Sequence, residues 1–181
     1  LQLELANLTR TFEELGSDRL ELVGELLHEA PRVWLLAMGL EEGLARYGRL
    51  LLSRARPDVQ LLGGQPGAIA EDLAMTGPRD ALVLLVLSPR ARALRPIIDY
   101  ARTTRMNVIT LTDPRGRLAA QRFSRVVIPC HVASQGLGPS HTALVSALRL
   151  IALALEVRSG APATRRADLI AEIHEELEDL E

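Results

Sequence analysis

This chain of 181 residues contains no lysine. Aromatic residues make up only 3% of it, and Cys130 is its single cysteine. A single cysteine excludes an internal disulfide and a cysteine-based metal cluster, which is typical of a protein in a reducing cytoplasm. With so few aromatic side chains, the core must consist mainly of Leu, Ala, Val and Ile. The formal net charge of −2 gives no global electrostatic reason to bind nucleic acid, although all 21 basic residues are arginine.

Long hydrophobic runs and a secretory signal are also lacking. No apolar run reaches the ~18 residues of a membrane span, because Arg149 and Glu156 interrupt the best candidate. We therefore expect a cytoplasmic protein without a membrane partner. The chain begins at Leu1 inside a helical pattern, so we expect a further N-terminal part to precede it.

The stretch 80–112 carries two short apolar runs with a helical pattern between them. Ala81–Leu87 is apolar throughout and stops at Ser88, and Val108–Leu111 is the second run. Such runs are typical of parallel strands buried on both faces, so the stretch predicts a βαβ unit. Parallel sheets bind ligands just beyond the carboxyl ends of their strands. Here that place is 88–92, where a hydroxyl and backbone N–H groups suit a phosphate.

Strand and helix patterns alternate along the rest of the chain. Further strands are predicted at Val33–Met38, Val59–Leu62 and Arg125–Pro129. Further helices are predicted at 1–15, 18–30, 40–55, 66–76, 117–122, 139–159 and 165–181. This order predicts an α/β fold, a three-layer α-β-α sandwich around a five-stranded, mainly parallel sheet.

The helices carry more apolar surface than one such sheet needs as cover. The stretch 143–155 has a broad apolar face, and both terminal helices are amphipathic. We therefore expect a homodimer or a homotetramer. The predicted division is a linker helix at 1–16, an α/β domain at 17–160 and a C-terminal amphipathic helix at 161–181, which packs on the domain or on a partner subunit.

Several short motifs in this order resemble a known family. They are the Asn7-Leu8-Thr9-Arg10-Thr11 element, the turns AMGLE (37–41) and VLSPRA (86–91), the pair Leu111-Thr112 followed by Asp113, and Ser140 near the start of the long helix. The chain resembles a sugar isomerase (SIS) domain, and more narrowly the effector-binding half of RpiR-family transcriptional regulators. The resemblance implies a flavodoxin-like topology and a phosphosugar-like effector at the strand ends. It also implies that DNA is bound only by an N-terminal helix-turn-helix that this chain does not include.

The ligand motifs depart from the family pattern, in which Ser and Thr hydroxyls hold the phosphate. Glu41 stands where the first turn has a serine, and Val86, Pro89 and Ala91 replace the serine, glycine and threonine of the second turn. Only Gly39 and Ser88 remain in these two turns, so the phosphate cradle is degenerate.

Two charged residues point to different ligands. A carboxylate at Glu41 repels a phosphate and favours an amine or an unphosphorylated sugar, whereas Arg90 is able to hold an anion bidentately. His141 is placed to reach the site mouth from the long helix. The predicted ligand-binding residues are Gly39, Glu41, Ser88, Arg90, Thr112, Ser140 and His141. Cys130 and His131 point to opposite faces, so we predict no catalytic residue, and we predict no metal and no cofactor.

Three functions fit these observations. The leading hypothesis is a ligand-sensing and oligomerisation domain of a bacterial regulator of sugar metabolism, which is not an enzyme and binds a sugar phosphate or a related carbohydrate. The second is a phosphosugar isomerase, for which Glu41 and His141 are the candidate bases. The third is a dimerisation domain whose pocket is closed by Leu40, Pro89 and Glu41.

Overall fold

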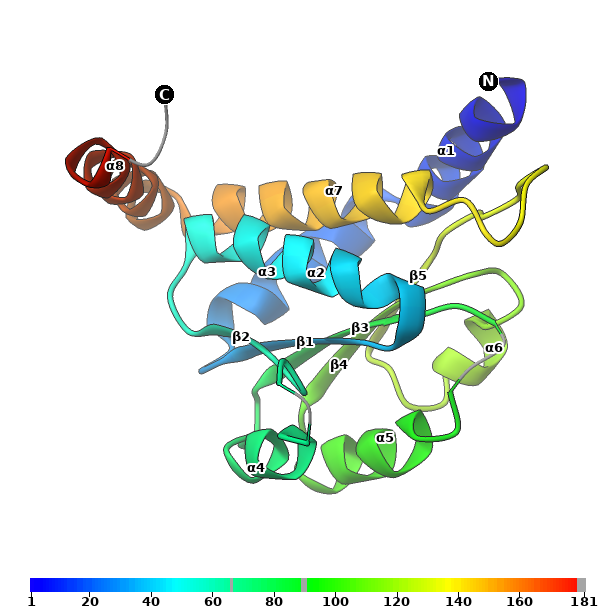
Figure 1. The fold of residues 1–181 in the computed structure, drawn as a ribbon, viewed down its shortest axis with the longest axis horizontal. Helices are drawn as coiled ribbons and strands as arrows, with labels where there is room; N and C mark the ends of the chain where they lie inside the picture. The colour runs from blue at the N-terminus through cyan, green and yellow to red at the C-terminus, as the bar shows by residue number, and fades with distance from the viewer. Residues whose placement is uncertain (66, 89–90, 179–181) are drawn as a thin grey trace.

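Five parallel strands form one sheet at the centre of the molecule (Figure 1). The computed structural model describes residues 1–65, 67–88 and 91–178. The strands are β1 (Val33–Ala37), β2 (Val59–Leu61), β3 (Ala81–Val86), β4 (Asn107–Thr112) and β5 (Val126–Pro129). Their order in the sheet is β2-β1-β3-β4-β5, and every pair is parallel, which confirms the predicted α/β class and flavodoxin-like topology.

Helices cover both faces of this sheet, so the predicted three-layer sandwich is confirmed (Figure 1). On one face lie α2 (Ser17–Glu29), α3 (Glu42–Ala55) and α7 (Thr142–Ser159), with α1 (Gln2–Leu15) and α8 (Ala161–Leu177) at their two ends. On the other face lie α4 (Ile69–Ala74), α5 (Leu94–Thr103) and α6 (Arg117–Ala120). A short 3-10 turn, η1 (Gly39–Glu41), leads into α3. Pro66, predicted to open a helix, lies outside the described residues.

The core has two halves, because alternate residues of a strand point to opposite faces of the sheet. The half under α7 contains Leu35, Val83, Ile109, Leu144 and Leu148, all at most 1% exposed. The half under α5 contains Leu36, Leu84, Val108 and Ile97. All residues of β3 are buried, as expected for a strand that is covered on both sides.

Asp80 organises the amino ends of the central strands. Its carboxylate, 2% exposed, accepts hydrogen bonds from the Trp34 indole (3.1 Å) and from the backbone N–H groups of Arg32 (3.1 Å) and Gly77 (2.9 Å). These hydrogen bonds tie the residue before β3 to the start of β1. None of the helices in the described part of the chain is long and apolar enough to cross a membrane.

Candidate functional site

Three of the predicted ligand residues follow neighbouring strands at the carboxyl edge of the sheet. Gly39 follows β1, Ser88 follows β3, and Thr112 ends β4, and these strands are adjacent in the order β1-β3-β4. The connections leave β1 and β3 in opposite directions across the sheet, and this switch point is where open α/β sheets form a crevice. The topology thus brings these three positions to one edge.

The Ser88 hydroxyl, which the sequence predicts as a ligand contact, is hydrogen-bonded to Asp113 of the same chain. Its Oδ1 atom accepts hydrogen bonds from the Ser88 backbone N–H (3.2 Å) and from Ser88 Oγ (3.0 Å). Asp113 is 5% exposed, and a buried carboxylate needs such donors. A ligand that is to bind Ser88 Oγ must therefore compete with Asp113.

Thr112 is covered by the turn that follows β4. It is 1% exposed, and its Oγ1 lies 3.5 Å from Asp113 Oδ1. A Cβ atom at Gly116 would lie 2.1 Å from Thr112 Oγ1, so only glycine lets the turn close over this hydroxyl. Thr112 thus shapes the edge of the crevice from beneath the turn.

Glu41 and His141 form a pair across the carboxyl edge. His141 Nε2 lies 2.8 Å from Glu41 Oε1, and the two side chains are only 26% and 14% exposed. The contact joins the turn before α3 to the residue that precedes α7. The structure therefore brings together the two residues that the sequence proposed as bases.

Ser140 points to α1. Its Oγ donates a hydrogen bond to Glu4 Oε2 at 2.7 Å, and this bond is the main reason why the pKa of Glu4 is lowered below its usual value. Ser140 and His141 are neighbours in sequence but have different partners. Arg90, the seventh predicted ligand residue, lies outside the described residues.

A polar stripe on α1, at residues 4, 7, 11 and 14, binds the segment 131–140 between β5 and α7. The Asn7 amide donates to Ala133 O (2.8 Å) and accepts from Ala133 N–H (3.2 Å), and Thr11 Oγ1 accepts from His131 N–H at 2.9 Å. Glu14 binds the His131 ring at 2.9 Å. The sequence pattern did not predict this stripe, although its spacing of three and four residues was visible, because the partners of these polar residues lie about 120 residues away in the chain.

The apolar stripe of α1 is largely exposed instead. Leu1, Leu5 and Phe12 are 95%, 53% and 41% exposed, and only Leu15 of that stripe is buried. Leu40, which the dimerisation hypothesis places over the pocket, is 78% exposed. Three of the predicted ligand residues, Ser88, Ser140 and His141, are hydrogen-bonded to the carboxylates of Asp113, Glu4 and Glu41.

Cys130 and His131 do not form a nucleophile and base pair. Burial raises the pKa of the Cys130 thiol to about 12, so it stays protonated and unreactive at neutral pH. The His131 ring binds Glu14 on α1. Across the residues that the structure describes, no three His, Cys, Asp or Glu side chains are grouped closely enough to hold a metal ion.

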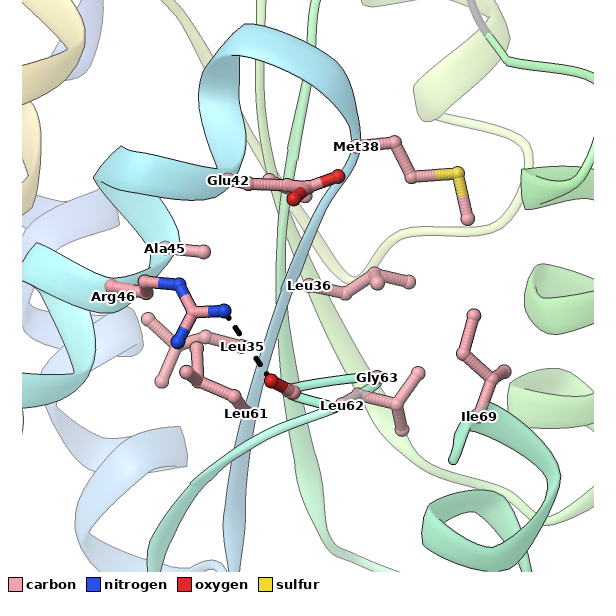
Figure 2. A pocket seen from close by; sticks show the side chains of 12 residues that line it. Leu35, Leu36, Met38, Glu42, Ala45, Arg46, Leu61, Leu62, Gly63 and Ile69 are labelled. Carbon is pink, nitrogen blue, oxygen red and sulfur yellow. Dashed lines mark hydrogen bonds between the residues drawn. The ribbon is translucent and has the colours of Figure 1, made fainter. Parts of the chain in front are cut away.

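A cavity of about 300 Å³ opens beside this crevice, at the carboxyl ends of β1 and β2 (Figure 2). Glu42 and Arg46, from the first turns of α3, point toward it, and leucine, alanine, methionine, isoleucine and glycine residues form the rest of its wall. The six predicted ligand residues that the structure describes do not line it. The carboxyl edge thus holds a group of predicted ligand residues with carboxylate partners in the same chain, and an open cavity beside them.

Comparisons with known proteins place the fold. No family model matches the chain, and no curated protein matches its sequence. The SIS domain of an RpiR transcription factor from Sphaerobacter thermophilus superposes with a TM-score of 0.84 over 93% of this chain and 94% of that one, at 18% identity. NanR of Vibrio vulnificus, solved with ManNAc-6P, gives 0.78 over 97% and 67%, also at 18% identity. Phosphoheptose isomerase GmhA of Neisseria gonorrhoeae gives 0.63 over 86% and 92%, at 14% identity. The fold is therefore that of SIS domains.

Proposed function

We propose that this SIS-fold chain is the effector-binding and oligomerisation module of a bacterial, cytoplasmic transcriptional regulator of sugar metabolism. The observation that carries the proposal is the similarity to an RpiR transcription factor domain over nearly the whole of both chains, with a TM-score of 0.84 against 0.63 for the isomerase. DNA binding is assigned to a helix-turn-helix outside this chain. The near-neutral charge supports this division, since a DNA-binding surface needs a basic patch.

We assign a carbohydrate derivative to the crevice, held by Gly39, Glu41, Ser88 and His141. Of the other described candidates, Thr112 lies beneath the turn and Ser140 binds Glu4 on α1. The complex of NanR with ManNAc-6P supports this ligand class. The carboxylates of Glu41 and Asp113 accept hydrogen bonds, so they favour hydroxyl and amine groups on the ligand and repel a phosphate dianion. We therefore expect this module to bind an amino sugar or an unphosphorylated sugar more tightly than the corresponding sugar phosphate.

The segment between β5 and α7 offers a route from this ligand to the N-terminal helix. His131, Ala133 and Ser140 in this segment bind α1, and His141 next to them binds Glu41 in the crevice. A ligand that breaks the Glu41–His141 contact disturbs the segment that holds α1. Such a ligand biases the position of α1 by its different affinity for the two arrangements.

Exposed apolar side chains support self-association. They are Leu5 and Phe12 on α1, Leu153 and Val157 on α7, and Leu169, Ile173 and Leu177 on α8. Isolated exposed leucines are ordinary, but stripes on three helices on the same side of the sheet suit an interface. We propose a homodimer or homotetramer in which the helices at 1–16 and 161–181 pack across subunits. Light scattering that shows a monomer at micromolar concentration would contradict this.

A thermal-shift and calorimetric screen tests the effector proposal. The ligands are ManNAc-6P, ManNAc, mannosamine and further sugars and sugar phosphates, and the proteins are the wild type, Ser88→Ala and Glu41→Ser. Ser134→Ala, in the exposed part of the loop, is the matched control. A ligand at about 100 times its dissociation constant raises the melting temperature by roughly 5–10 °C.

The outcomes separate the hypotheses. A shift that disappears in Ser88→Ala but persists in Ser134→Ala supports an effector in the crevice. A shift with sugar phosphates that appears only in Glu41→Ser shows that this carboxylate excludes the phosphate. If no carbohydrate shifts any of these proteins, the effector proposal is wrong.

A second candidate function, phosphosugar isomerisation, is favoured by the 2.8 Å contact between Glu41 and His141. A carboxylate and an imidazole in contact are a suitable pair for moving a proton between adjacent sugar carbons. Incubation with aldose and ketose phosphates, followed by NMR, tests it. Turnover that is lost in Glu41→Gln would establish an enzyme, and the regulatory proposal expects no turnover.

A further inference from the structure

The cavity at the carboxyl ends of β1 and β2 combines an apolar floor with two charged groups at its mouth (Figure 2). Leu36 and Leu62, which are 2% and 3% exposed, form the floor, and Met38 and Ile69 line the side away from α3. A volume of about 300 Å³ is at the lower end of the range for small-molecule sites. The cavity therefore suits a compact ligand with an apolar part.

Glu42 and Arg46 face the cavity without pairing with each other. They are four residues apart on α3, with the acid first, which is the spacing at which opposite charges on a helix attract. Both residues are described by the structure, and no salt bridge of 4 Å or less joins them. The space between the two charges is open to a ligand.

Each of the two charged groups keeps binding capacity. Arg46 Nη2 donates one hydrogen bond, to Gly64 O at 3.3 Å, and no carboxylate in the described part of the chain lies within 4 Å of its guanidinium. Glu42 Oε1 accepts one hydrogen bond, from Gly39 N–H at 3.1 Å. The guanidinium is thus able to hold a carboxylate, and the second carboxylate oxygen of Glu42 is able to accept from an ammonium group.

The far wall of the cavity is fixed before any ligand binds. Gly63 N–H donates to Asp72 Oδ2 at 2.7 Å, and Leu62 N–H donates to Leu35 O at 2.9 Å. Gly63 has a φ of +71°, and a Cβ atom there would lie 2.7 Å from Ile69 Cγ1, so only glycine fits this turn. A preformed wall lowers the ordering cost of binding.

We propose that this cavity binds an aliphatic α-amino acid such as leucine. Arg46 holds the α-carboxylate, Glu42 holds the α-ammonium group, and the side chain lies on Leu36 and Leu62. A sugar suits the cavity poorly, because its hydroxyl groups would face these leucines without hydrogen-bond partners. The site differs from the carbohydrate crevice in its lining, and Gly39, which donates to Glu42, lies between the two.

Calorimetric titration of the whole chain with L-leucine tests the proposal. Leucine is compared with 4-methylpentanoate, which lacks the ammonium group, and with 3-methylbutylamine, which lacks the carboxylate. Arg46→Gln and Glu42→Gln are the test variants, and Arg49→Gln on α3 and Glu13→Gln on α1 are matched controls that do not line the cavity. All four positions are at least partly exposed, so we expect these substitutions to leave the melting temperature unchanged. Measuring that temperature verifies that each variant folds.

We expect leucine to bind, and each lost charge to weaken binding by about tenfold or more. Arg46→Gln should bind leucine about as weakly as the wild type binds 3-methylbutylamine, and Glu42→Gln should match 4-methylpentanoate in the same way. In the series glycine, alanine, valine, leucine, each added methylene should tighten binding by about fourfold until the cavity is full.

Three results would overturn the proposal. One is no saturation at about 10 mM leucine, tenfold above a millimolar dissociation constant. Another is equal leucine binding by the wild type and Arg46→Gln. The third is leucine binding that is lost in Ser88→Ala but kept in Arg46→Gln, which would place the ligand in the crevice. Leucine binding without any carbohydrate binding would support this site while the carbohydrate proposal fails.

Discussion

Several of the hydrogen bonds between the polar stripe of α1 and the segment 131–140 can be removed by substitutions at two buried side chains. Three hydrogen bonds join Asn7 and Thr11 to the backbone of His131 and Ala133, and Asn7 and Thr11 are 3% and 0% exposed. Each such bond contributes about 1 kcal/mol net. The variant Asn7→Ala/Thr11→Val removes all three hydrogen bonds. We therefore expect the free energy needed to detach α1 from the domain to fall by about 3 kcal/mol. Detachment of α1 should then become roughly 100-fold more frequent.

Hydrogen exchange followed by mass spectrometry measures this effect. The amides of α1 should exchange roughly 100-fold faster in the double variant, whereas the amides of the buried face of α7 should change much less, because α1 opens locally. Glu13→Ala, on the exposed side of α1, is the control. If α1 exchanges at the wild-type rate, the core contacts of Leu8 and Leu15 and not the polar stripe hold this helix, and the proposed route from the crevice to α1 fails.

Further predictions concern single groups. Asp80→Ala leaves the Trp34 indole and two backbone N–H groups without their acceptor, so we expect a loss of about 3 kcal/mol or more in urea unfolding, and an unchanged midpoint would contradict it. The Cys130 thiol, with a pKa of about 12, should resist iodoacetamide at pH 8 in the native protein and react in urea; rapid native labelling would refute its burial. The lowered pKa of Glu4 means that its contact with Ser140 stabilises the fold above the usual carboxyl pKa, and that this stabilisation is lost as the pH falls through the lowered value. In Ser140→Ala an NMR titration should show the Glu4 pKa rising toward its usual value, and an unchanged pKa would exclude this hydrogen bond as the cause.

The predictions that depended on short-range pattern agree with the structure. Ala81–Val86 and the end of β4 are buried strands because such runs have no polar face, and parallel pairing follows from the helix between them. The boundaries differ by a few residues: α7 begins at Thr142 and not at Pro139, and α8 begins at Ala161 and not at Arg165. The resemblance to SIS domains rested on the same order of elements, which is why it pointed to the fold that the structure has.

Side-chain partners far apart in the sequence were not predictable in the same way. Glu41 and His141 are 100 residues apart, Ser140 and Glu4 are 136 apart, and Ser88 and Asp113 are 25 apart. A turn motif shows that a hydroxyl is present at a strand end, but it does not show whether a ligand or a carboxylate of the same chain binds that hydroxyl. The exposed leucines of α1 illustrate the same limit, because an amphipathic pattern does not say which of its faces meets the core.

By itself the sequence determined the alternation of strands and helices, the parallel sheet and the end of the sheet at which the candidate ligand residues lie, since these follow from local hydrophobic period and from the chirality of βαβ connections. Only the tertiary structure decided what lies at that end. It paired Glu41 with His141 and Ser88 with Asp113, attached α1 by its polar stripe, and left Glu42 and Arg46 apart across an open cavity. These outcomes depend on the packing of elements that are distant in the chain, because a hydrogen bond or a cavity forms only where the fold brings its two sides together.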